Sequence, residues 1–247
     1  MKIVCFGRLF QFSGLGIAMY LLLLSLLCSL GFWQLGRAEQ KERFLERQRD
    51  ALALPPLDLN HERIEDVESV RYRQALLHGH YDTAHQFLLD NQILDGKSGY
   101  FVLTPFILDG GGAVLVNRGW LPASGDRRQL PVIDFDTDTT RVQGRIDHFP
   151  SLGIKLQGVE IPCEGWPSRL QFVDVQRLAD KLAYPLLDFQ IQLDANAADG
   201  FRREWKIQTT ITPEKHLGYA VQWFGLALAL TGLFIWISSQ KRSDHTA

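Results

Sequence analysis

The sequence is poor in the residues on which most metal and redox centres depend. It has three cysteines in 247 residues, and only Cys163 lies outside the first apolar segment and its flank. One thiol in the central region excludes an internal disulfide, a Cys-x-x-Cys redox pair and a cysteine-only zinc site there. The two methionines, Met1 and Met19, argue in the same way against a soft copper site.

The sequence also lacks a charge excess and the common motifs of enzymes. Lysine plus arginine (26) nearly balance aspartate plus glutamate (28), so there is no basic excess for nucleic-acid binding. No Gly-x-Ser-x-Gly nucleophile motif occurs. Gly96-Lys97-Ser98 resembles the end of a phosphate loop, but Asn91 stands where that motif requires a glycine. We therefore expect a protein that is not an enzyme.

Two long stretches contain no charged residue. They cover residues 9–36 and 217–240, and about 20 apolar residues suffice to cross a bilayer. The fold prediction is thus a membrane protein in which two transmembrane helices flank an extramembrane domain. The expected division is a cytoplasmic N-terminus 1–12, transmembrane helix 13–36, periplasmic domain 37–216, transmembrane helix 217–238 and cytoplasmic C-terminus 239–247.

The first apolar stretch is predicted to be a retained anchor. It is about twice as long as the 7–15-residue core of a signal peptide, and no Ala-x-Ala site follows it. It also begins too early to leave room for an Arg- and Ser-rich mitochondrial transit peptide, which favours a bacterial inner membrane. Charge counting leaves the orientation open, because Lys2 and Arg8 are outnumbered by five cations after the first span, whereas Lys241 and Arg242 follow the second.

The domain between the two stretches has the pattern of a mostly β (α+β) fold. A helix is expected to continue over 37–50 until Pro55-Pro56, and Asp174 is expected to cap a second helix that ends before Pro185. Asp109-Gly110-Gly111-Gly112 predicts a hairpin between two of the strands. Strands are predicted at 70–77, 87–89, 100–108, 113–120, 141–147 and 187–193.

Three histidines near one another provide the case for a metal-dependent enzyme. His78 and His80 would share one face of a strand, with His85, Asp82 and Asp90 nearby. Two imidazoles at this spacing also fit an ordinary polar strand end, which we favour. Asp134, Asp136 and Asp138 alternate as in a calcium loop, but the required glycine and closing glutamate are missing, which predicts a solvated acidic loop.

Two further places combine a polar residue with aromatic ones. Arg118 and Trp120 end a predicted strand and would either contact a partner or pack inside the domain, the arginine pairing with a carboxylate. His216 is the last ionisable residue before the second span, with Tyr219 and Trp223 roughly on one helical side. These three would form a cofactor site, with His216 as the ligand of a haem iron, or His216 would simply anchor the helix at the interface.

Five ordered blocks of this chain resemble the Surfeit locus protein one family, membrane factors for assembly of cytochrome c oxidase. The blocks are Phe32-Trp33-Gln34-Leu35-Gly36-Arg37, Gly79-His80-Tyr81-Asp82, and those covering 99–106, 114–122 and 216–226. The chain departs from the family at Glu214-Lys215, where members commonly carry an asparagine, and over 151–166.

The resemblance implies a periplasmic domain and termini in the cytoplasm. It further implies a role in maturing the haem-bearing subunit of the oxidase, by binding or delivering haem a with His216 as the ligand. The expected partners are that subunit, the haem a synthesis machinery and the lipid bilayer. A scaffold that stabilises an oxidase subunit without any cofactor is the alternative, and a metal-dependent periplasmic enzyme ranks below it.

Overall fold

The chain is organised as two units, which are described separately. A computed structural model describes residues 2–5, 8–11, 13–125, 129–133, 138–150, 163–205 and 211–241. The first unit, called the helix unit, comprises Met1–Glu46 and Gln208–Ala247. The second, called the barrel unit, comprises Arg47–Ile207.

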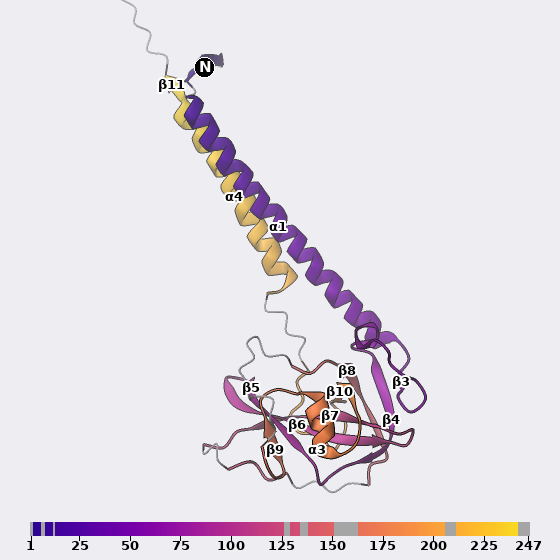
Figure 1. The fold of residues 1–247 in the computed structure, drawn as a ribbon. Helices are drawn as coiled ribbons and strands as arrows, with labels where there is room; N and C mark the ends of the chain where they lie inside the picture. The colour runs from indigo at the N-terminus through magenta and orange to yellow at the C-terminus, as the bar shows by residue number, and fades with distance from the viewer. Residues whose placement is uncertain are drawn as a thin grey trace, which may run out of the picture. The chain divides into compact units, whose positions relative to one another are not determined.

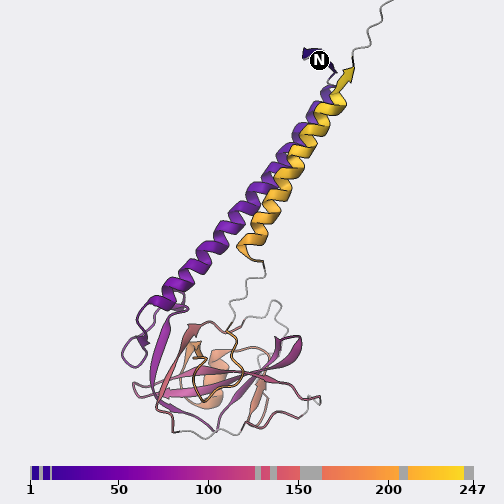
Figure 2. The ribbon, with the colours of Figure 1, turned by 180° about the vertical axis from the view of Figure 1, so that it is seen from behind.

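The helix unit is built on two long helices that lie side by side, α1 (Gly14–Ala53) and α4 (Pro213–Ser238) (Figures 1 and 2). Strands β1 (Lys2–Cys5), β2 (Arg8–Gln11) and β11 (Ser239–Lys241) form a small sheet in which the N-terminal strands pair with the segment after α4. The strands before α1 and the strand after α4 therefore meet at the same end of the helix pair, as two antiparallel apolar helices require.

Both helices extend beyond the apolar stretches that predicted them. The predicted continuation of the first helix is confirmed, because α1 runs on to Ala53 and ends just before Pro55-Pro56. An ion pair between Glu39 and Arg43 at 2.5 Å supports this charged part at i, i+4 spacing. Helix α4 begins at Pro213, a favoured residue for the first turn, and so starts one turn before the charge-free run.

The barrel unit is mostly β, which confirms the predicted fold of a β-rich domain flanked by two apolar helices. Its strands are β3 (Leu57–Asp58), β4 (Gln74–Tyr81), β5 (Phe87–Leu94), β6 (Lys97–Leu108), β7 (Ala113–Pro122), β8 (Arg141–Asp147), β9 (Ser168–Leu170) and β10 (Leu186–Leu193). Its helices beyond α1 are the short α2 (Val67–Val70) and α3 (Val175–Leu182).

The sheet of this unit closes on itself. Its order is β3-β4-β8-β10-β7-β6-β5-β9, and an additional pairing between β4 and β6 completes a ring of β4, β8, β10, β7 and β6. The closing contact needs a glycine, because Gly79 has a φ of 153° and a Cβ atom there would overlap the Ile107 carbonyl oxygen. Closure removes the free edges of the ring strands.

Most predicted elements of the domain are present, and one is wrong in part. Strand β8 has the predicted bounds, and β6 and β7 pair antiparallel through the predicted hairpin. The strand predicted at 70–77 begins only at Gln74, because Asp66 caps α2 by accepting a hydrogen bond from the Glu68 backbone N–H. The backbone is therefore helical up to Val70.

The core lies inside the barrel and beneath α3. Fully buried side chains inside the barrel include Leu77, Phe106 and Ile191. Helix α3, capped as predicted by Asp174, buries Leu178 and Leu182 in a second cluster with Phe87 and Leu103. These contacts give the barrel unit a water-excluding interior of the kind that soluble domains have.

Candidate functional site

A buried polar pair lies between the two long helices. His216, in the first turn of α4, is 7% exposed, and Gln34 of α1 is 9% exposed. The His216 Nδ1 atom is 2.7 Å from the Gln34 Oε1 atom, across 182 residues of sequence. Buried polar groups are costly unless they are hydrogen-bonded, so this contact fixes how the two helices are rotated against each other at this level.

The pair lies where the apolar part of α1 ends. Gln34 is one turn before Arg37, the first charged residue after the apolar stretch, and the Arg37 guanidinium lies 5.8 Å from the centre of the Trp33 ring. Trp33 itself is 54% exposed. An exposed tryptophan beside the first cation is typical of the boundary between membrane and water.

Aromatic contacts set the register of the two helices on the other side of the pair. Phe224 of α4 meets Phe32 edge to face at 5.3 Å, and a Cβ atom added at Gly31 would lie 2.7 Å from the Phe224 ring. Further along, Tyr20 stacks on Phe234 at 4.3 Å and hydrogen-bonds Thr231 at 3.0 Å. The approach of Gln34 to His216 is thus part of a packed interface.

The predicted cofactor residues lie on one side of α4, but they differ in how far they are buried. Tyr219 and Trp223 follow His216 by three and seven residues, which brings them to the same helical side. His216 is buried toward α1, Trp223 is half-buried, and Tyr219 is 45% exposed. The assignment of these residues to a cofactor stays a prediction.

Gln34 is the site residue that the sequence analysis did not identify. Two features of the sequence could have indicated it. Gln34 is an uncharged polar residue near the end of the first apolar stretch, and His216 is a histidine directly before the second apolar stretch. A polar side chain at such a place normally faces another helix and not the lipid.

Charges surround this pair at the start of α4. Glu214, in the first turn of α4, is exposed. Lys215, also exposed, lies between Glu214 and His216 in the sequence. An imidazole with a lysine beside it in the chain has the chemistry to hold a metal-bearing ligand that also carries carboxylates.

Arg118 and Trp120 are buried in the barrel unit, at 3% and 5% exposure. The Arg118 Nε atom donates to the Asp199 carbonyl oxygen at 2.7 Å, and its guanidinium lies 5.0 Å from the Phe201 ring centre. Burial lowers the pKa of Arg118 to about 10. Trp120 donates from Nε1 to the Gln92 carbonyl oxygen at 2.9 Å.

These contacts bury Arg118 within the domain, and its pairing with a carboxylate stays a prediction. The hydrogen bond from Nε goes to the Asp199 backbone carbonyl, and the guanidinium is packed on the Tyr81 and Phe201 rings. Both side chains hold segments of the domain together, and their proposed contact with a partner stays a prediction.

The three histidines of the enzyme hypothesis do not come together. His78 and His80 share the outer face of β4 as predicted, but His85 turns to Asp82, with its Nδ1 atom 2.7 Å from Oδ2. Asp90 is buried and caps the Asn91 backbone N–H. Among the described residues there is no group of three His, Cys, Asp or Glu side chains that could hold a metal ion. Asp134 and Asp136 lie outside the described residues.

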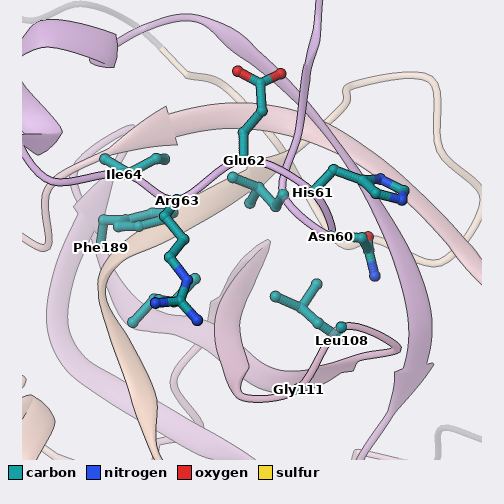
Figure 3. A pocket seen from close by; sticks show the side chains of 11 residues that line it. Asn60, His61, Glu62, Arg63, Ile64, Leu108, Gly111 and Phe189 are labelled. Carbon is teal, nitrogen blue, oxygen red and sulfur yellow. The ribbon is translucent and has the colours of Figure 1, made fainter.

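A cavity of about 370 Å³ lies in the barrel unit, away from all predicted site residues. Figure 3 shows it between the 59–64 loop and the β6–β7 turn, with the Arg63 side chain directed toward it and Glu62 directed away. Leu108 and Phe189 form apolar parts of its lining. None of the lining residues was predicted to belong to a site, and the lining suggests no specific chemistry.

Comparisons with known proteins bear on the helix pair and the barrel together. The SURF1 family model matches residues 21–228. A SURF1-like protein of Rickettsia felis is 26% identical over 230 residues, covering 87% of this chain and 93% of the relative. Surfeit locus protein 1 of Arabidopsis thaliana is 23% identical over 254 residues, covering 82% and 72%.

A shorter match relates the chain to a yeast protein. The cytochrome oxidase assembly protein SHY1 of Saccharomyces cerevisiae is 33% identical over 94 residues, which is 37% of this chain and 24% of the yeast protein. The family match extends from within α1 to within α4 and includes Gln34, the whole barrel unit and His216. It confirms the resemblance found in the sequence blocks, and the chain belongs to the SURF1 family.

Proposed function

We propose that this protein is a membrane-bound assembly factor for cytochrome c oxidase that helps to mature the haem-bearing subunit. The observation that carries the proposal is the family match over residues 21–228, together with the yeast relative whose name states a role in cytochrome oxidase assembly. The expected partners are the haem-bearing subunit and the enzymes of haem a synthesis.

The proposed location is a bacterial inner membrane, with α1 and α4 crossing it and the barrel unit in the periplasm. The most apolar windows of the two helices have mean hydropathies of 2.2 and 1.8, and only 6% and 11% of their residues are buried. A core helix of a soluble protein would be mostly buried, so these surfaces call for an apolar solvent. Bacterial relatives match nearly the whole chain, which supports the choice of membrane.

The exposed Cys163 provides a direct test of this orientation. A membrane-impermeant maleimide added to intact spheroplasts is expected to label Cys163 and not a Cys163→Ser variant. Labelling that requires lysis of the spheroplasts would place the barrel unit in the cytoplasm and contradict the proposed topology.

We further propose that His216 holds haem a as cargo on its way to the oxidase. The residues at the site fit this ligand in three respects. The His216 imidazole would supply a nitrogen ligand for the iron, the exposed Lys215 would supply a cation for a propionate, and the apolar helix surface would accept the hydrophobic ring and tail. Bound there, the iron would need no thiolate, which agrees with the scarcity of cysteine.

The test is the visible spectrum of the detergent-purified protein, produced together with the haem a synthesis enzymes. The parent is expected to carry haem a and a His216→Ala variant to lose it. A folded but colourless parent would contradict haem binding and leave oxidase assembly without a cofactor.

That outcome would favour the second candidate, a cofactor-free scaffold for an oxidase subunit. The specific observation in its favour is the burial of His216, whose hydrogen bond to Gln34 already ties α4 to α1. Purification of the colourless protein with a bound oxidase subunit would support this candidate.

A further inference from the structure

We infer that Gln34 is a positioning residue for the ligand function of His216: it holds the imidazole in the tautomer whose Nε2 atom can bind an iron. This inference rests on the haem-binding function proposed above and names the residue that prepares the site. Gln34 contacts His216 and not the haem, so its effect on haem binding is indirect.

The first observation is the isolation of the contact. Both side chains are more than nine-tenths buried, and the 2.7 Å separation of Nδ1 and Oε1 is that of a short hydrogen bond. Among the residues that the structure describes, Gln34 is the hydrogen-bond partner of the His216 ring. Bulk water is largely excluded from the contact, so the ring's orientation depends on Gln34.

The second step concerns the proton. A neutral imidazole carries one N–H, and the other nitrogen has the lone pair that coordinates a metal. Because the amide oxygen of Gln34 can only accept, Nδ1 carries the proton and donates it to Oε1. The lone pair is then on Nε2, the nitrogen that does not bond to Gln34.

The opposite orientation of the amide would reverse the result. An amide N–H₂ group facing Nδ1 would donate to it, and Nε2 would then carry the proton and could not bind iron. A glutamate at position 34 has no donor when ionised, so it permits only the productive arrangement. The pair Gln34→Leu and Gln34→Glu therefore separates positioning from mere space filling.

The expected effects follow from the behaviour of residues that hydrogen-bond a metal-binding histidine. Loss of such a partner typically costs about 10–100-fold in affinity for the metal group. Gln34→Leu keeps a side chain of similar volume without a polar atom, and we expect its affinity for haem a to fall by that factor. Gln34→Glu is expected to retain binding and to lower the haem reduction potential, because a carboxylate makes the imidazole a stronger donor.

The chain offers a matched control in the same helix pair. Tyr20→Phe removes the hydrogen bond from Tyr20 to Thr231 but keeps the stacking on Phe234. If hydrogen bonds between α1 and α4 served only to hold the helices together, Tyr20→Phe and Gln34→Leu would weaken haem binding alike.

The experiment is a titration of the purified full-length proteins with haem a, followed by redox titration of each loaded protein. The inference is supported if Gln34→Leu binds weakly, Tyr20→Phe binds like the parent, and Gln34→Glu binds with a lowered potential. It is overturned if Gln34→Leu binds like the parent while His216→Ala does not bind. Should Gln34→Leu fail to fold, a Gln34→Glu protein with an unchanged potential would overturn it.

Failure of the underlying function gives a different result. A parent that binds no haem a, or that binds it as tightly as His216→Ala, contradicts the haem site itself and the inference with it. The two failures are therefore told apart by the parent and His216→Ala, before any Gln34 variant is considered.

Discussion

The helix unit and the barrel unit place their apolar side chains in opposite ways. In the helix unit, large apolar residues face outward, with Leu15 at 78%, Leu228 at 75% and Trp236 at 71% exposure. In the barrel unit, Phe87 and Phe106 are fully buried. Large apolar side chains are thus exposed on the surface of the helix unit, whereas in the barrel unit they form the core.

The buried residues of the helix pair are of a different kind. Beside the aromatic contacts of Phe224 and Phe234, they are small or polar, among them Ala220, Ala227 and the Gln34–His216 pair. Lipid is as apolar as leucine, so helices in a bilayer gain more from close packing and hydrogen bonds than from burying apolar surface. This difference agrees with the proposed location of the helix unit in a bilayer, and the following predictions test that comparison.

The largest effect is expected in the barrel core. Phe106→Ala removes a fully buried ring that packs edge to face on Tyr81 at 5.0 Å, and it should destabilise the barrel by about 3–5 kcal/mol. Leu228→Ala, on the outer face of α4, should change stability by less than about 0.5 kcal/mol. Urea unfolding of the full chain in detergent measures both. Equal losses would mean that the outer face of α4 is packed against protein.

A smaller effect is expected from overpacking the helix pair. Gly31→Leu would push side-chain atoms into the Phe224 ring, at a cost of about 1–3 kcal/mol to helix pairing. Cysteines introduced as Tyr20→Cys and Phe234→Cys in a background without native cysteines allow bis-maleimide cross-linking, whose yield should fall. Gly36→Leu, where an added Cβ atom meets nothing, is the matched control. Equal yields for all proteins would contradict the packing at Gly31.

A comparable or smaller effect is expected for the buried cation of the barrel. Arg118→Leu leaves the Asp199 carbonyl oxygen without its donor and should lower stability by about 1–3 kcal/mol. Arg177→Leu, on the exposed side of α3, should have little effect. Thermal unfolding distinguishes the two. If Arg118→Leu is stable but no longer supports oxidase assembly, the predicted partner contact would gain support over the structural role.

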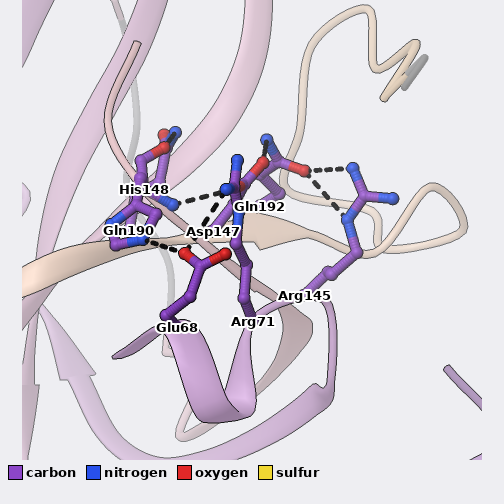
Figure 4. Close-up of polar contacts among 7 residues, drawn as sticks. All are labelled: Glu68, Arg71, Arg145, Asp147, His148, Gln190 and Gln192. Carbon is purple, nitrogen blue, oxygen red and sulfur yellow. Dashed lines mark hydrogen bonds and ion pairs between the residues drawn. The ribbon is translucent and has the colours of Figure 1, made fainter. Parts of the chain in front are cut away.

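The smallest effect is expected at a polar network on the barrel surface, in which α2 meets β8 and β10 (Figure 4). The Glu68 carboxylate lies 2.9 Å from the His148 Nε2 atom, and Arg71 donates to Asp147 at 2.9 Å. The hydrogen bond from His148 lowers the pKa of Glu68 below its usual value.

A lowered carboxyl pKa in the folded state has a defined consequence. The stabilisation is fully present above the unfolded value of about 4.3 and is lost as the pH falls through the folded value. Because Glu68 is largely exposed, the gain is less than about 1 kcal/mol. Melting temperatures between pH 6 and 3 should fall less steeply for Glu68→Gln than for the parent, and Glu62→Gln should behave as the parent. Parallel curves for Glu68→Gln and the parent would show that the contact adds nothing.

The local elements of the barrel were largely predictable. Strand β8 was found because Val142, Gly144 and Ile146 alternate with polar residues, and α3 because Asp174 caps it. Strands β3 and β9 were missed because two or three residues carry no periodic pattern. The ring could not be predicted, because the pairing of β4 with β6 depends on a close approach of the two strands at Gly79. No pattern in the neighbouring residues indicates that approach.

By itself, the sequence determined two apolar helices, a β-rich domain between them and membership of a family, because charge-free length, alternation and ordered motifs are properties of the chain alone. Only the tertiary structure decided that Arg118 is buried with its Nε atom donating to the Asp199 backbone carbonyl, and that Gln34 contacts His216. Such partners depend on how helices are rotated and strands are paired, and those choices are made by packing between residues far apart in the chain.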